Sequence, residues 1–100
     1  MAVTSKVLFR GAAATTSTTL YTTPATATAV VTNIGVTNTT TAAVTASVLL
    51  DDVALLSGVS VDAKTSIFID LKQVVDASDT IKGSASTTAV NFHISGVEIN

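Results

Sequence analysis

The sequence holds few side chains suited to acid–base catalysis, and its one histidine is His93. A hydrolytic triad needs a nucleophile, a histidine and an orienting carboxylate within hydrogen-bonding reach of one another. On an extended strand, the residues in phase with His93 are Asn91 and Ser95, and no serine stands in a recognisable nucleophile turn. We therefore expect a protein that is not an enzyme, with His93 facing solvent or a neighbouring subunit. In a subunit contact, protonation of this imidazole would make the contact sensitive to pH.

The aspartates gather in three short segments, and calcium binding is the chemistry to consider there. Calcium takes about six to eight oxygen ligands from a loop of densely spaced acidic residues. The segments 51–52, 62 and 76–79 match neither an EF-hand nor a nonapeptide repeat. Because a turn aspartate commonly bonds to its own backbone, these segments predict turns instead. We expect no metal and no cofactor.

Other binding motifs are also missing. The four aromatic residues are too dispersed for a platform that stacks nucleic-acid bases or sugars. The glycines are isolated, so no phosphate-binding loop is expected. A net charge of −2 gives no electrostatic case for nucleic acid or an anionic membrane. Residues 1–10 lack the apolar stretch of a secretory signal, and no apolar run is long enough to span a bilayer.

The elements that must position these residues are β-strands. Thr occurs 19 times and Val 14 times, and both are β-branched residues that fit a pleated sheet better than a helix. Residues 11–50 carry no charge, yet they hold too many branched apolar residues for a disordered tail. The three- and four-residue spacing of an amphipathic helix is not sustained. The composition and spacing together predict an all-β chain.

Alternation of apolar and polar residues marks about eight short strands. They cover residues 5–10, 18–22, 30–37, 44–50, 53–61, 65–71, 80–86 and 90–99. The connections are too short for parallel crossovers, so the pairing should be antiparallel. We predict an antiparallel β-sandwich, either a jelly roll or an Ig-like Greek key. Residues 1–14 form an N-terminal arm or first strand, and residues 15–100 form the single sandwich domain.

Period-two spacing also predicts which side chains face the core. Val30 shares a face with Ile34 and Val36, which leaves Val31 on the opposite face. Phe92 is expected in the core. The last strand changes phase near its end, and a β-bulge at Gly96 would account for the change.

The surface predicted from these faces suits contacts with other proteins. Sheets without charges on their edges tend to pair with other chains. The segment 2–10 places apolar residues between two basic ones, and it is either an ordinary first strand or an arm that adds a strand to a neighbouring sheet. Phe68 is out of phase with its apolar neighbours, so we expect it on the outer face. The candidate interface residues are Lys6, Val7, Leu8, Phe9, Arg10, Phe68 and His93.

Four segments of the sequence are informative together: TTLYTTPA (18–25) followed by AVVTNI (29–34), then IDLKQVVDASDTI (69–81) and HISGVE (93–98). These segments resemble the small single-domain virion proteins of tailed bacteriophages. The resemblance implies a capsid cement or decoration protein that caps the outer surface of the head and stabilises contacts between major capsid subunits. It implies the major capsid protein or other virion proteins as partners, and self-association as a dimer or trimer. The expected location is the capsid surface of the virion, after assembly in the host cytoplasm.

Three other functions remain as alternatives. A tail, neck or fibre-associated virion module would look the same in sequence, and its position on an intact particle would identify it. A carbohydrate-binding module would need an exposed aromatic cluster that includes Phe68 or Tyr21. An enzyme would need a pocket that brings His93 beside a carboxylate and a serine.

Overall fold

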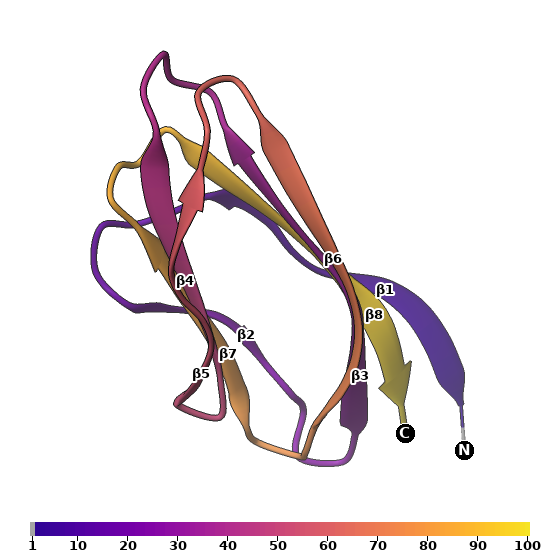
Figure 1. The fold of residues 1–100 in the computed structure, drawn as a ribbon. Helices are drawn as coiled ribbons and strands as arrows, with labels where there is room; N and C mark the ends of the chain where they lie inside the picture. The colour runs from indigo at the N-terminus through magenta and orange to yellow at the C-terminus, as the bar shows by residue number, and fades with distance from the viewer. Residues whose placement is uncertain (1) are drawn as a thin grey trace.

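The computed structural model describes residues 2–100, which form two facing β-sheets (Figure 1). The strands are β1 (Val3–Ala12), β2 (Thr18–Thr22), β3 (Thr28–Asn38), β4 (Val44–Leu50), β5 (Val53–Val61), β6 (Ser66–Val75), β7 (Thr80–Ala85) and β8 (Val90–Ile99). The predicted strands are confirmed, although β6 continues to Val75, beyond its predicted end at Leu71. Met1, the first residue of the predicted segment 1–14, lies outside the described residues. Between residues 2 and 100, the structure has no helix that could span a membrane.

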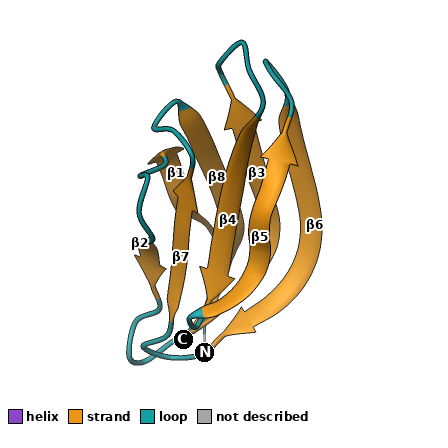
Figure 2. Cartoon of the chain, turned by 60° about the vertical axis from the view of Figure 1, so that its left-hand side comes forward, coloured by secondary structure: helices purple, strands orange, loops and turns teal. Residues whose placement is uncertain are grey.

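The strand order identifies the sandwich as a jelly roll. Sheet A has the order β1-β8-β3-β6, and sheet B has the order β2-β7-β4-β5. Every paired strand is antiparallel to its neighbour, as predicted. The chain passes from one sheet to the other at every connection except the β4–β5 hairpin, and Figure 2 shows sheet B in front of sheet A. Two interleaved Greek keys of this kind distinguish a jelly roll from an Ig-like sandwich.

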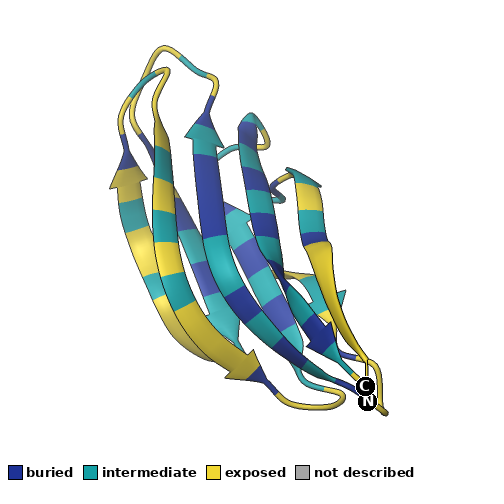
Figure 3. Ribbon diagram, turned by 90° about the vertical axis from the view of Figure 1, so that its right-hand side faces the viewer, coloured by how far each residue is buried: buried dark blue, intermediate teal, exposed yellow. Residues whose placement is uncertain are grey.

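The core lies between the inner faces of the two sheets. Phe92 and Ile94 from β8 meet Ile81 from β7 and Val48 from β4, and all four are fully buried. Figure 3 shows the resulting bands of buried and less buried residues along the strands. The predicted core position of Phe92 is confirmed. Burial of this apolar surface is the main term that stabilises the two layers.

The β4–β5 hairpin shows why the aspartate segments form turns. Asp51 and Asp52 both have positive φ angles, 52° and 60°. A two-residue hairpin turn of type I′ requires this conformation at both central residues, and aspartate tolerates it better than most residues. The predicted turn at 76–79 is also confirmed, because the Asp79 amide donates to the Asp76 carbonyl at 3.0 Å.

The predicted phase of β3 is wrong at its start. Val31 and Ile34 are both fully buried, whereas Val30 is only partly buried and lies on the outer face. The pairing register of β3 shifts between Val31 and Asn33, so an extra residue lies between the two buried positions. A β-bulge of this kind breaks the period of two that the sequence analysis assumed.

The predicted phase change in β8 is wrong as well. The strand alternates without interruption, so that Gly96 and Glu98 face inward like Phe92 and Ile94. Gly96 is not a bulge residue, because the register shifts lie in its partner strands β1 and β3. A Cβ atom on Gly96 would lie 2.2 Å from the Val30 carbonyl oxygen, so close packing explains the glycine.

Candidate functional site

The candidate site is the outer face of sheet A, which no other element covers within residues 2–100. The register places Arg10 beside His93, His93 beside Gly35, and Gly35 beside Phe68. These residues form one cross-strand row over all four strands of the sheet. Three of the side chains selected from the sequence therefore lie on one surface, although they are far apart in the chain.

Arg10 and His93 interact directly in this row. The Arg10 Nε–H donates to His93 Nδ1 at 3.2 Å, and only a neutral imidazole can accept this hydrogen bond. In the described part of the chain, His93 has no hydrogen bond to a carboxylate or a serine. The arrangement is that of a surface contact and does not resemble a catalytic triad.

Phe68 is the large apolar side chain of the row. It is 67 % exposed, which confirms the prediction that it lies on the outer face. Its ring packs against Gly35, where an added Cβ atom would lie 2.8 Å from Phe68 Cε1. Because Gly35 has no side chain, the Phe68 ring lies close to the sheet. The opposite face of the ring is open to a partner.

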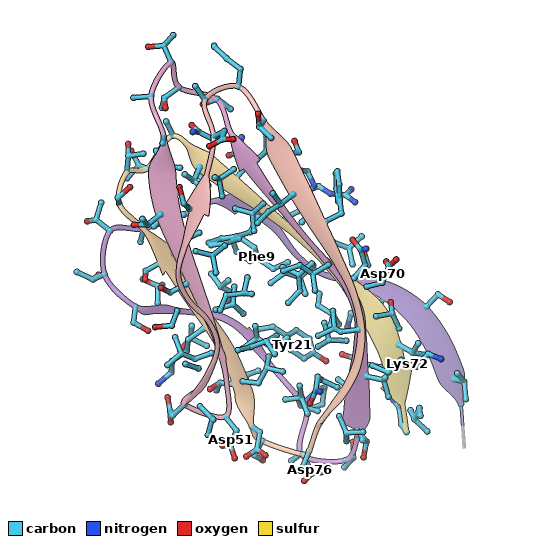
Figure 4. The ribbon with its side chains drawn as sticks, in the orientation of Figure 1. Phe9, Tyr21, Asp51, Asp70, Lys72 and Asp76 are labelled. Carbon is cyan, nitrogen blue, oxygen red and sulfur yellow. The ribbon has the colours of Figure 1, made fainter. Side chains whose placement is uncertain are left out.

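A second group of apolar side chains occupies the outer face nearer the chain ends. We call it the valine face, and it consists of Val3, Val7, Val30, Val74, Val97 and Ile99. Val30 lies directly between Val97 of β8 and Val74 of β6. Asp70 and Lys72 project from the same sheet on its β6 side (Figure 4). Val3, Val7 and Val74 are its most exposed members. Exposed apolar surface of this kind can mark a protein contact, a membrane contact or a ligand-binding groove.

Leu8 and Phe9, which were also selected as interface residues, turn toward the core of their own chain. Leu8 is 6 % exposed, and Phe9 packs against the core. The register of β1 shifts between Val7 and Phe9, and the bulge turns both side chains inward. Along its whole length β1 pairs with β8 of the same chain.

Lys6 belongs to a polar cluster that sequence analysis missed. Its Nζ donates to Glu98 Oε2 at 3.0 Å, and the Tyr21 hydroxyl donates to the same oxygen. Tyr21 lies on sheet B and points between the sheets (Figure 4), so the cluster connects the two layers. The feature of the sequence that could have indicated this cluster is Glu98, because it is a carboxylate in phase with the buried residues of β8.

Within this cluster, the pKa values of Glu98 and Tyr21 are both shifted. The hydrogen bond from Tyr21, followed by that from Lys6, holds the pKa of Glu98 below its ordinary value. Burial, followed by the hydrogen bond to Glu98, raises the pKa of Tyr21. Glu98 is only 7 % exposed, and a buried carboxylate needs such partners to remain charged. This cluster has a structural role, because it joins the two sheets through side-chain contacts to one carboxylate oxygen.

The acidic end of the sandwich is built from turns. Asp51 and Asp76 lie at this end in Figure 4, close to Asp79. Burial, followed by the charges of Asp51 and Asp76, raises the pKa of Asp79. These aspartates border a shallow depression that Val53 and Val74 also line. Nowhere in residues 2–100 do three or more His, Cys, Asp or Glu side chains form a group that could hold a metal ion.

Comparison with known proteins identifies similarity of fold. No family model and no curated protein matches the sequence. A chain from the structure of the infectious bursal disease virus Gx strain matches with a TM-score of 0.55 and 12% identity, over 97% of this chain and 31% of that one.

Two structures of a pentameric capsid protein isolated from metagenomic phage sequences also match this chain. Both show 20% identity over 90% of this chain, with TM-scores of 0.41 and 0.31, and the match covers 58% and 59% of their chains. The chain therefore spans less than two thirds of each of these three chains. The bursal disease virus chain shares the β-sandwich fold, and this is what the comparison shows.

Proposed function

We propose that this protein is a structural component of a virion, and that it acts as a capsid cement or decoration protein. The observation that carries the proposal is the uncovered outer face of sheet A, where the valine face adjoins the row from Arg10 to Phe68. Rigid strands, not loops, present this surface. The fold shared with a chain of a virus structure supports the same assignment.

The partner that fits this face is the major capsid protein. A protein that binds the assembled shell, and does not bind free capsid subunits, stabilises the shell by mass action. A copy that contacts two neighbouring subunits gains further affinity, because its second contact is intramolecular. Aromatic residues, Phe among them, are enriched in the cores of protein interfaces, so Phe68 is the residue of this face that we expect to contribute most to binding.

The location of the protein on the particle tests this proposal. Virus particles purified from cells that produce the chain would be imaged by electron cryomicroscopy, and the copy number of the chain in them would be measured by quantitative mass spectrometry. We expect density on the outer surface of the head, in a copy number set by the capsid lattice. Density at the tail, the neck or a fibre would assign the protein to the alternative virion module, and absence from particles would overturn a virion role.

A binding assay tests which surface is used. Capsids stripped of the protein would be incubated with wild type, with a Phe68→Gln variant or with a Leu55→Gln variant. Leu55 is the matched control because it is an exposed apolar residue on β5 of the other sheet. We expect Phe68→Gln to lower the affinity at least about tenfold, in keeping with an interface hot spot. Equal binding by Phe68→Gln and wild type would show that the outer face of sheet A is not the contact.

The aromatic side chains do not favour carbohydrate binding. Tyr21 points between the sheets and bonds to Glu98, whereas Phe68 lies on the outer face of sheet A. Phe9 and Phe92 pack in the core. A platform that binds a sugar needs several aromatic rings on one surface, and these four rings do not share a surface.

A further inference from the structure

The edge of β1 carries backbone hydrogen-bonding groups that have no strand beside them within residues 2–100. Ala2 and Asn100 exchange both of their backbone hydrogen bonds, at 2.7 and 2.9 Å. Hydrogen-bonded and non-hydrogen-bonded pairs alternate along an antiparallel ladder. The register continues unbroken to Val7, so the N–H and C=O groups of Val3, Ser5 and Val7 point away from β8.

The other three sheet edges are less suited to strand pairing. β2 is interrupted by a register shift in its middle, between Thr19 and Tyr21, so it offers no unbroken stretch of the length found in β1. β5 contains two register shifts and a glycine with a φ of 57° at position 58. β6 carries Asp70 and Lys72, and charges on an edge strand discourage pairing. The edge of β1 from Val3 to Val7 is regular, and its single charged side chain, Lys6, faces inward to Glu98.

The sequence of this edge is self-complementary. The side chains on the outer face are Val3, Ser5 and Val7, and they read the same in both directions about Ser5. An antiparallel copy centred there would place each Val3 beside a Val7 and the two Ser5 residues beside each other. On the inner side, each Lys6 would meet a Thr4 and would be kept apart from the other Lys6. The bulge after Val7 would end the pairing.

We propose that β1 pairs with β1 of a second copy of this chain, antiparallel and about a two-fold axis at Ser5. Three residue pairs would each exchange two backbone hydrogen bonds, and the two copies of sheet A would form one continuous sheet. The valine faces of both copies would then be adjacent on one side of the dimer. The inference deepens the proposed function and rests on it for the biological setting, but its tests use the isolated protein.

Disulfide trapping tests the register, because the chain contains no cysteine. Cα atoms of a hydrogen-bonded antiparallel pair lie about 5.5 Å apart, within the range that a disulfide bridges. We expect a Ser5→Cys variant to form a covalent dimer under mild oxidation. A Val3→Cys variant alone should form no covalent dimer, because its two cysteines would be about 13 Å apart along the paired strands. It should cross-link when it is mixed with a Val7→Cys variant. Cross-linking of Val3→Cys alone, with none for Ser5→Cys, would overturn the register.

Analytical ultracentrifugation tests the dimer itself without a covalent link. Wild type should sediment at up to twice its 10.1 kDa chain mass as concentration rises. A Ser5→Pro variant removes one outward N–H and should be monomeric, with unchanged far-ultraviolet circular dichroism. A Ser66→Pro variant on the edge of β6 is the matched control and should still dimerise.

Two outcomes would refute the β1 pairing. Wild type that stays monomeric at every concentration would exclude the dimer, and a dimer that persists in the Ser5→Pro variant would place the contact elsewhere. A dimer trapped at Ser5 in a protein that is absent from virions would overturn the proposed function and leave the pairing intact.

Discussion

Glu98 shows how one residue can belong to the core without being apolar. Its carboxylate lies on the inner face of β8, where the loss of hydration has to be offset by hydrogen bonds. Lys6 and Tyr21 supply these bonds from two different sheets. An unpaired carboxylate at this position would be costly, so the three residues depend on one another.

The lowered pKa of Glu98 predicts a loss of stability in acid. A carboxyl group whose pKa is lower in the folded state contributes stability above its unfolded pKa of about 4.3, and this contribution is lost as pH falls through the folded value. Asp79, whose pKa is raised in the folded state, has the opposite effect: its charged form lowers stability at neutral pH, and this loss of stability disappears as pH falls and the carboxyl group is protonated. We therefore expect the stability difference between wild type and a Glu98→Gln variant to shrink as pH falls below about 4.3, measured by urea unfolding. A difference that does not vary with pH would contradict a charged role for Glu98.

Gly96 gives a prediction about close packing. Its missing side chain leaves room for the Val30 carbonyl and for Leu8. We expect Gly96→Ala to lower the free energy of unfolding by about 1–3 kcal/mol, as overpacking does in other cores. Gly11→Ala is the control, because the added Cβ atom would approach only the Phe9 ring, at 3.3 Å. Thermal or urea unfolding of both variants would show whether the effect is specific to position 96.

At the scale of elements, Asn38 holds the end of β3 to two loops. Its side-chain amide donates to the carbonyls of Ala42, Val61 and Asp62 at 2.8–3.1 Å. Its side-chain oxygen accepts hydrogen bonds from the Thr40 amide and hydroxyl. One buried side chain thus satisfies the backbone of the β3–β4 and β5–β6 connections, which lie at the same end of the sandwich.

Replacing Asn38 should destabilise the protein because these carbonyls would lose their donors. We expect Asn38→Ala to reduce the free energy of unfolding by about 1–3 kcal/mol, the usual result of leaving buried polar groups unsatisfied. Asn33→Ala is the matched control, since its amide bonds only to the exposed Asp70, at 2.9 Å. Its effect should stay within about 0.5 kcal/mol. If urea unfolding gave similar losses in the free energy of unfolding for both variants, the contacts of Asn38 with the two loops would contribute no more stability than the exposed Asn33–Asp70 hydrogen bond.

At the scale of the whole molecule, the jelly roll is an elongated slab of 46 × 21 × 18 Å. Its first and last strands pair side by side in sheet A, so both ends of the chain contribute to one outer face. Sheet B covers the inner face of sheet A and leaves the outer face for contacts (Figure 2). The depressions that residues of this outer face line are open, so the face suits contact with another protein better than the enclosure of a small molecule.

This surface predicts a weak dependence of attachment on salt. The valine face carries no charge, and added salt screens only interactions between charged groups. We expect the affinity for capsids to change less than about tenfold between low and high ionic strength, as measured by co-sedimentation. A steep loss of binding in salt would point to Arg10, Lys72 and Asp70 as the main contacts instead.

The sequence by itself determined the secondary structure and its turns. The abundance of Thr and Val, the alternation along each strand and the Asp51–Asp52 turn are local features that act within a few residues. The same local pattern correctly placed Phe92 in the core and Phe68 outside it. Local rules sufficed because they depend on backbone preference and on period-two burial, neither of which requires knowledge of the partner strand.

Only the tertiary structure decided which strands pair and where the pairing shifts. The bulges beside Leu8 and Thr32 changed the faces of β1 and β3, and they arise from the fit between neighbouring strands. The link from Tyr21 to Glu98 and the row from Arg10 to Phe68 join residues far apart in the chain. A period of two assigns side chains to faces but carries no information about the neighbouring strand, and one inserted residue exchanges the faces.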